Sequence, residues 1–179
     1  VCYECKHVGM LSIKTANKSV EDALKMPDPV DLYYGLLNEG EVACLFADSN
    51  AGKSIFAVQM ADYISRYRKV LYVDCELSEK QFQLRYTSKE MGFRYVFSDN
   101  FYRAEIDPEH IGVQNYDEAI IKDIEAASLQ TDSKIVIIDN LTYLCNSSEN
   151  GDVAGLFMMM LIVEKNIFTL TLLLISHTS

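Results

Sequence analysis

The chain has 179 residues, with 16 Lys or Arg against 26 Asp or Glu, so its net charge is −10, and 49% of the residues are hydrophobic. This composition excludes an intrinsically disordered chain, and eight glycines and three prolines exclude collagen-like or proline-rich material. The acidity argues against a generally basic nucleic-acid or membrane coat, which needs clustered Lys and Arg.

The length predicts one domain with a short appendage, and we place the appendage at residues 1–29 and the core at 30–179. Cys2, Cys5 and His7 have the spacing of half a zinc site, and a frayed terminal segment is the alternative. The five cysteines are an odd number, which favours a reducing, cytoplasmic setting over a disulfide framework. No signal peptide or stretch able to cross a membrane is expected.

Segments with helical and strand periodicity alternate along the chain. In order, we expect a helix from Ser19 to about Met26, a strand over 41–46, a helix over 55–64, a strand over 69–74, a helix from the Ser78–Gln81 capping box to Gly92, a strand over 101–106, a helix from Asn115 to about Leu129, a strand over 134–139, a helix from about Asp152 and a strand over 169–175. This order predicts a three-layer α/β/α fold with a mainly parallel sheet.

The loop after the first core strand has the pattern of a phosphate-binding loop. It reads Ala47-Asp48-Ser49-Asn50-Ala51-Gly52-Lys53-Ser54 and matches G-x-x-x-x-G-K-[ST] except at Ala47. Backbone N–H groups at a strand-to-helix turn form an anion cradle, which Gly52 lets a phosphate approach. Lys53 is suited to the β- and γ-phosphates and Ser54 to Mg²⁺.

Acidic residues follow two other buried strands. Asp139 ends the most apolar strand, where a carboxylate can hold Mg²⁺. Glu76 follows the second core strand and is a candidate to orient the attacking water, with Asp74 as its competitor and a solvated loop carboxylate as the ordinary alternative. His177 leaves the last strand and is a candidate γ-phosphate sensor or an ordinary polar residue.

These motifs in this order resemble the RecA-like ATPase superfamily, in particular its RepA-like hexameric helicase and KaiC-type branch. The resemblance covers about residues 30–179 and is carried by G-L-L-N-E-G-E, A-D-S-N-A-G-K-S, V-L-Y-V-D-C-E, I-V-I-I-D-N-L and L-L-I-S-H-T. It implies ATP and Mg²⁺ as cofactors, with Glu76 as catalytic base and His177 as sensor. It further implies a nucleotide-contacting role for Arg85, for which an exposed helix arginine is the alternative.

The resemblance also implies a ring-shaped homohexamer that acts with single-stranded DNA or a DNA-processing complex. By the same comparison the core is expected to be incomplete at its C-terminal end, since the arginine finger and later strands would follow the sensor. We therefore expect an ATPase that serves DNA replication, mobilisation or unwinding. The alternatives are a regulatory ATPase of the KaiC type, a small-molecule kinase with the same loop, and a domain that binds nucleotide without hydrolysing it.

Overall fold

The computed structural model describes residues 6–8, 11–106, 116–140 and 170–177, and the chain divides into two compact units, Val1–Val30 and Asp31–Ser179. In the first unit, β1 (Lys6–Val8) and β2 (Leu11–Ile13) form an antiparallel pair that the sequence did not predict, and α1 (Ala16–Ala23) follows. The predicted start and end of this helix are wrong. The cap is Thr15 instead of Ser19, because the Thr15 side chain accepts the Lys18 N–H at 3.2 Å.

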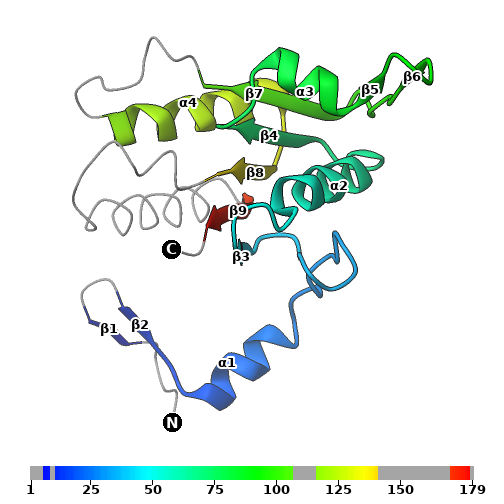
Figure 1. Ribbon diagram of the computed structural model, residues 1–179. Helices are drawn as coiled ribbons and strands as arrows, with labels where there is room; N and C mark the ends of the chain where they lie inside the picture. The colour runs from blue at the N-terminus through cyan, green and yellow to red at the C-terminus, as the bar shows by residue number, and fades with distance from the viewer. Residues whose placement is uncertain (1–5, 9–10, 107–115, 141–169, 178–179) are drawn as a thin grey trace. The chain divides into compact units, whose positions relative to one another are not determined.

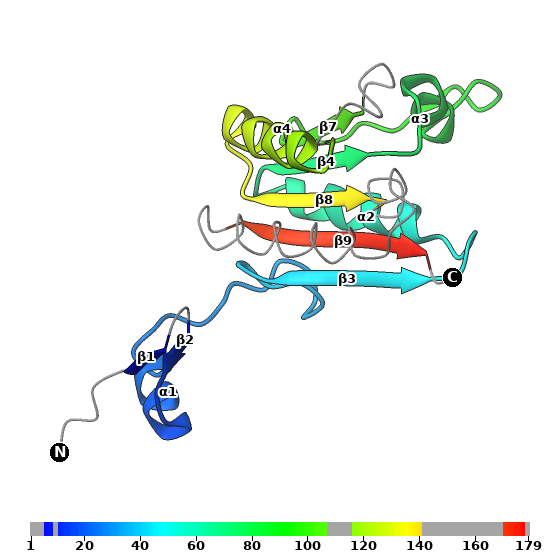
Figure 2. The ribbon, with the colours of Figure 1, turned by 90° about the vertical axis from the view of Figure 1, so that its left-hand side faces the viewer.

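The second unit is built on a five-stranded sheet. Its strands lie in the order β3 (Val42–Ala47), β9 (Thr171–His177), β8 (Ile135–Asp139), β4 (Val70–Asp74) and β7 (Phe101–Glu105), and all four pairings are parallel (Figure 2). Every residue of β4 and β8 is buried. Burial of both faces is what the predicted three-layer fold requires of its central strands, because helices then cover the sheet on either side.

Helices cover both faces of the sheet, which confirms the α/β fold (Figure 1). On one face, α2 (Lys53–Ser65) packs against Val70 and Tyr72 of β4 and against alternate residues of β8 and β9. On the other face, α4 (Tyr116–Thr131) packs against Leu71 and Val73. Since side chains alternate across a strand, Tyr72 and Asp74 lie on the α2 face.

The region after β4 differs from the prediction. The capping box of Ser78 and Gln81 opens α3 (Glu79–Arg85), as expected, but the helix ends seven residues before Gly92. A small antiparallel pair follows, β5 (Thr87–Ser88) and β6 (Phe93–Arg94), and Gly92 serves the turn between them with φ 58°. The Tyr86 carbonyl accepts the Tyr95 N–H at 2.9 Å, and this pairing ends the helix.

Two predicted helices fall partly or wholly outside the described residues. α4 lies where the third core helix was expected, but its proposed cap, Asn115, lies outside the description, as does the helix expected from Asp152. Among the described helices, none is both long and apolar enough to cross a membrane.

Candidate active site

The carboxyl ends of the parallel strands bring the predicted polar residues to one edge of the sheet. Asp74 of β4 lies opposite Asp139 of β8 in register, and Glu105 of β7 lies on the other side of Asp74. On the far side of β8, Asp139 lies opposite Ile175 of β9, and His177, two residues further, lies opposite Ala47 of β3. The phosphate loop and both predicted acids therefore leave the same edge of the sheet.

The loop from Ala47 to Ser54 forms the predicted strand-to-helix turn. Asn50 and Gly52 have positive φ angles of 64° and 86°, and Gly52 is the residue before α2. Lys53 is 6% exposed, and its Nζ donates to the carbonyl oxygens of Ala47 at 2.6 Å and Asp48 at 2.7 Å. Ala47 ends β3 without a positive φ, so the missing first glycine of the pattern imposes no backbone strain.

Asp139 is a buried carboxylate with one oxygen that accepts no hydrogen bond in the described part of the chain. Its side chain is 3% exposed, Oδ2 accepts the Tyr72 hydroxyl at 2.5 Å, and Oδ1 is the unpaired oxygen. Burial raises the pKa of Asp139, and the Tyr72 and Ser54 hydroxyls act in the opposite direction. A buried oxygen without a hydrogen-bond partner, on a carboxyl group that the Ser54 hydroxyl also reaches, fits a divalent cation with oxygen ligands such as Mg²⁺.

Glu76 lies two residues beyond β4 and is joined to the end of β8. The Asn140 side-chain amide donates to Glu76 Oε1, and Asn140 directly follows Asp139. The backbone N–H of Cys75 donates to the Asp139 carbonyl at 2.6 Å, which extends the contact between the two strands beyond their ends. The structure therefore brings the predicted base and the predicted metal ligand together.

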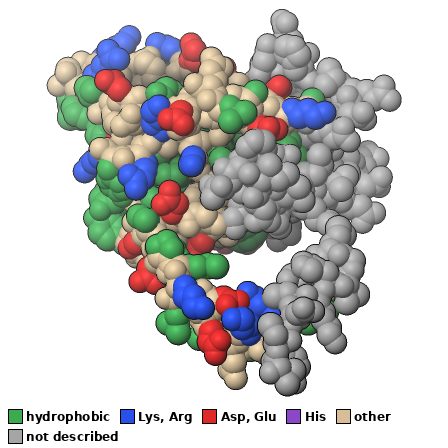
Figure 3. Space-filling view, turned by 180° about the vertical axis from the view of Figure 1, so that it is seen from behind, with side chains coloured by type: hydrophobic (Ala, Val, Ile, Leu, Met, Phe, Trp, Pro, Cys, Tyr) green, Lys and Arg blue, Asp and Glu red, His purple; other side chains and the backbone are tan. Residues whose placement is uncertain are grey.

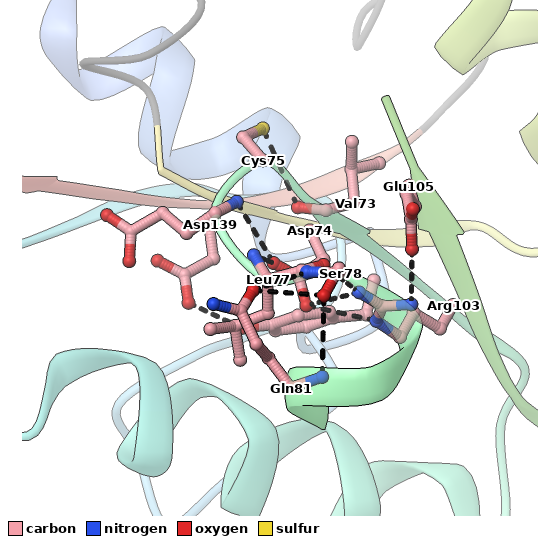
Figure 4. Close-up of polar contacts among 11 residues, drawn as sticks. Val73, Asp74, Cys75, Leu77, Ser78, Gln81, Arg103, Glu105 and Asp139 are labelled. Atoms are coloured by element: carbon pink, nitrogen blue, oxygen red, sulfur yellow. Dashed lines mark hydrogen bonds and ion pairs between the residues drawn. The ribbon is translucent and has the colours of Figure 1, made fainter. Parts of the chain in front are cut away.

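Asp74, the competitor of Glu76, has both carboxylate oxygens occupied. Oδ1 accepts the backbone N–H groups of Glu76 at 3.1 Å and Leu77 at 2.9 Å, and Oδ2 accepts Arg103 Nε at 3.0 Å. Figure 4 shows Arg103 extending from β7 to this loop. With a 3% exposed side chain and these three donors, Asp74 is suited to hold the loop that carries Glu76.

The other two predicted site residues are less closely tied to this edge. The backbone of His177 ends β9 beside β3, and its side chain is not among those that the structure describes. Arg85 ends α3 and is exposed; burial raises the pKa of the adjacent Tyr86 hydroxyl, and the Arg85 charge opposes that rise. Among the contacts of the described residues, none joins Arg85 to the phosphate loop. Cys2 and Cys5 also lie outside the description.

Three residues at this edge did not stand out in the sequence as site residues: Tyr72, Arg103 and Asn140. Tyr72 is two positions before Asp74, so strand alternation alone places the two side chains on one face. Arg103 carried no comparable signal, because its importance depends on β7 lying next to β4. Asn140 was visible only as the residue after the strand-end acid.

Comparison with known proteins agrees with this geometry. The model of a family described as an AAA domain matches residues 12–179, which is nearly the whole chain and includes the phosphate loop and both strand-end acids. No curated protein in the comparison matches the chain. The chain belongs to this AAA-domain family of RecA-like P-loop NTPases.

Proposed function

We propose that this chain hydrolyses ATP in the presence of Mg²⁺, with Glu76 as the general base, and that hydrolysis drives a step of DNA replication, mobilisation or unwinding. The observation that carries the ATPase proposal is the arrangement at one sheet edge. There, Lys53 and Ser54 open α2, Asp139 offers a buried oxygen without a donor, and Asn140 holds Glu76 beside it.

The phosphate loop supplies binding and charge. The first N–H groups of a helix have no partner within it, so the start of α2 at Lys53 can donate to phosphate oxygens. Lys53 Nζ now donates to two loop carbonyls and can exchange them for the β- and γ-phosphates without leaving the loop. Gly52 keeps the approach to the backbone open.

Ser54 and Asp139 are the residues that would hold Mg²⁺, through the hydroxyl and through Oδ1 directly or by way of water. When bound, Mg²⁺ neutralises the charge that develops on the transferred phosphoryl group. Tyr72 fixes the Asp139 carboxylate through Oδ2, so that its remaining oxygen keeps one direction.

Glu76 is better suited than Asp74 to activate water. Asp74 is buried and accepts hydrogen bonds from three donors. Glu76 is an exposed residue just beyond the end of β4, and Asn140 fixes its carboxylate by a hydrogen bond to Oε1. In hydrolysis the water oxygen forms a bond to the γ-phosphorus and the bond from that phosphorus to the ADP oxygen breaks. The water proton passes to Glu76, and the products are ADP and inorganic phosphate.

Two variants test the ATPase proposal. Lys53→Ala is expected to weaken nucleotide binding, and Glu76→Gln is expected to retain binding while turnover falls by about 100-fold or more. Lys69→Ala is the matched control, since Lys69 is a surface residue paired with Asp132 at 3.2 Å. Unchanged hydrolysis in either site variant would overturn the proposal. Phosphate release without any acceptor distinguishes an ATPase from a small-molecule kinase.

The DNA-linked part of the proposal is supported by the resemblance to RepA-like helicases. Figure 3 shows Lys and Arg side chains spread singly among Asp and Glu on one face, so no general basic coat is visible there. DNA contact is then expected at a local channel of a ring. Single-stranded DNA should raise turnover several-fold, and light scattering with ATP and Mg²⁺ should show a hexamer. Turnover that is indifferent to DNA would favour a regulatory ATPase instead.

A further inference from the structure

A buried ion pair connects β7 to the loop that carries Glu76. Arg103 Nε and Nη2 each lie 3.0 Å from Asp74 Oδ2, and the side chains of Arg103 and Asp74 are 16% and 3% exposed. Arg103 Nη2 also donates to the Leu77 carbonyl, and the guanidinium lies 4.7 Å from the centre of the Phe82 ring. The guanidinium therefore contacts both the end of β4 and the start of α3 (Figure 4).

Asp74 connects Arg103 to the backbone of Glu76. While Oδ2 faces Arg103, Oδ1 accepts the backbone N–H groups of Glu76 and Leu77. The path from Arg103 to Glu76 thus consists of one ion pair and one backbone hydrogen bond. Asn140 fixes the other end of Glu76, its carboxylate.

The charges at this edge give Arg103 a second effect. Asp74 and Asp139 lie opposite each other on neighbouring strands, both buried, and Asp74 acts to disfavour a second negative charge on Asp139. The guanidinium partly neutralises Asp74. Removal of Arg103 would leave a buried carboxylate without its cation, which is strongly unfavourable unless the carboxylate moves toward water. Because Asp74 Oδ1 accepts the backbone N–H groups of Glu76 and Leu77, such a movement would shift the loop at Glu76.

We propose that Arg103 is a positioning residue for hydrolysis, which acts through Asp74 to set the place of Glu76. The inference rests on the proposed ATPase function, and it adds to the site a residue of β7, the strand at the edge of the sheet beside β4. Arg103 does not need to touch the nucleotide in this role. Its loss should lower the rate of hydrolysis and leave nucleotide affinity nearly unchanged.

A matched pair of variants separates this role from a stabilising one. Arg66 is the control because it also pairs with an aspartate, Asp62, at 3.3 Å and lies over an aromatic ring, Tyr63, at 5.8 Å, but its side chain is 62% exposed. In the full chain, Arg103→Met is expected to lower kcat by about tenfold to 100-fold, the effect of a small displacement of a reacting group. The Kd of a non-hydrolysable ATP analogue should change by less than about threefold. Arg66→Met should change neither.

Arg103→Lys covers the case in which Arg103→Met does not fold. Lysine keeps the positive charge beside Asp74, but it lacks the planar guanidinium group that donates to Asp74 and to the Leu77 carbonyl at the same time. The loop would therefore be held less precisely, and kcat should still fall. A normal kcat in the folded Lys variant would overturn the inference. Equal loss of analogue affinity and kcat would also overturn it, because that would show disruption of the nucleotide site.

A double variant with Glu76→Gln distinguishes failure of the proposed ATPase function from failure of the inference about Arg103. If Arg103 acts through Glu76, the double variant Arg103→Met/Glu76→Gln should hydrolyse no more slowly than Glu76→Gln alone. A further drop of the same size as in the single variant would show that Arg103 acts elsewhere. Full activity of Glu76→Gln would reject the proposed function itself, whereas an inactive Glu76→Gln with normal Arg103 variants would reject this inference alone.

Discussion

The Tyr72 hydroxyl of β4 donates a 2.5 Å hydrogen bond to Asp139 Oδ2 on the neighbouring strand β8. Tyr72 lies opposite Ile137 in register, so the bond runs diagonally to the residue two positions further on the same face. Both side chains are at most 3% exposed. One oxygen of the buried carboxylate is thereby satisfied inside the sheet, and the other, Oδ1, is the one a cation can use.

Removal of this hydroxyl should weaken both the fold and the metal site. Tyr72→Phe keeps the ring in the core but leaves Asp139 Oδ2 without its donor, so the free energy of unfolding should fall by about 1–3 kcal/mol. The Mg²⁺ concentration for half-maximal turnover should rise. Urea denaturation and a Mg²⁺ titration of ATPase activity measure the two effects.

Tyr102→Phe is the control for that variant, because Tyr102 packs on the opposite face of the sheet against the α4 core. Its free energy of unfolding and its Mg²⁺ requirement should stay close to those of the natural chain. Equal effects of the two substitutions would show that the hydroxyl of Tyr72 has no special role at Asp139.

Asp139→Asn should stabilise the metal-free protein while hydrolysis is lost. Burial raises the pKa of Asp139 above its value in the unfolded chain. Between these two pKa values the folded state binds more protons, so this group lowers stability as the pH rises through that window. In EDTA at pH 7 the Asn variant should be more stable by on the order of 1 kcal/mol. The difference should vanish below about pH 4.

Thermal unfolding across this pH range checks the sign. An Asn variant that is less stable than the natural chain at neutral pH would contradict the buried-charge account. The Tyr72 hydroxyl can still donate to the Asn oxygen, so loss of that hydrogen bond does not confuse the comparison.

Exchange of alanine and glycine should destabilise the protein at either end of the phosphate loop, for a different reason at each end. Gly52 has φ 86°, and no atom lies within 4 Å of the position that a Cβ would take there, so Gly52→Ala should cost about 1 kcal/mol through backbone strain alone. Ala47 is extended at the end of β3, so Ala47→Gly should also destabilise, by about 0.5–1 kcal/mol. Urea denaturation of both variants measures these costs. Stabilisation by Ala47→Gly would show that the loop entrance is strained by its alanine.

Cys75 should be a poorly reactive thiol in the folded protein. Burial raises its pKa strongly, and the carboxylates of Asp139, Asp74 and Glu76 add to the effect. Because the thiolate is the nucleophile, alkylation by iodoacetamide near pH 8 should be at least about tenfold slower than in the urea-unfolded chain. The alkylation rate of the folded protein should keep rising with pH beyond the range in which an ordinary thiol is fully ionised and its alkylation rate becomes constant. Peptide mass spectrometry follows the modification, and equal rates in both states would contradict the prediction.

The parts of the site that lie in one continuous run were predictable from the sequence. The loop from Ala47 to Ser54 could be identified because phosphate binding requires its residue types at fixed spacing. Asp139 and Glu76 could be placed at one edge because parallel strands end together. Gly92 was misread as a helix end because glycine serves helix ends and hairpin turns equally well, and local sequence does not distinguish the two.

Contacts that depend on the order of the strands could not be predicted. Arg103 reaches Asp74 only because β7 lies beside β4, and Tyr72 reaches Asp139 only because β8 lies on the other side. Periodicity indicates which residues form strands and which face they share, but not which strand becomes the neighbour of which. The positioning residues of the site were therefore outside the reach of sequence patterns.

The neighbour of β3 within the described residues is β9, a strand that comes far later in the chain. On the ribosome, the segment that ends in Ala47 emerges early, yet its sheet partner is synthesised after α2, β4, β7, α4 and β8. A nascent chain should then be unable to fix β3, and with it the phosphate loop, in the sheet until residues 171–177 have left the exit tunnel. Incomplete chains on the ribosome would therefore not bind or hydrolyse nucleotide.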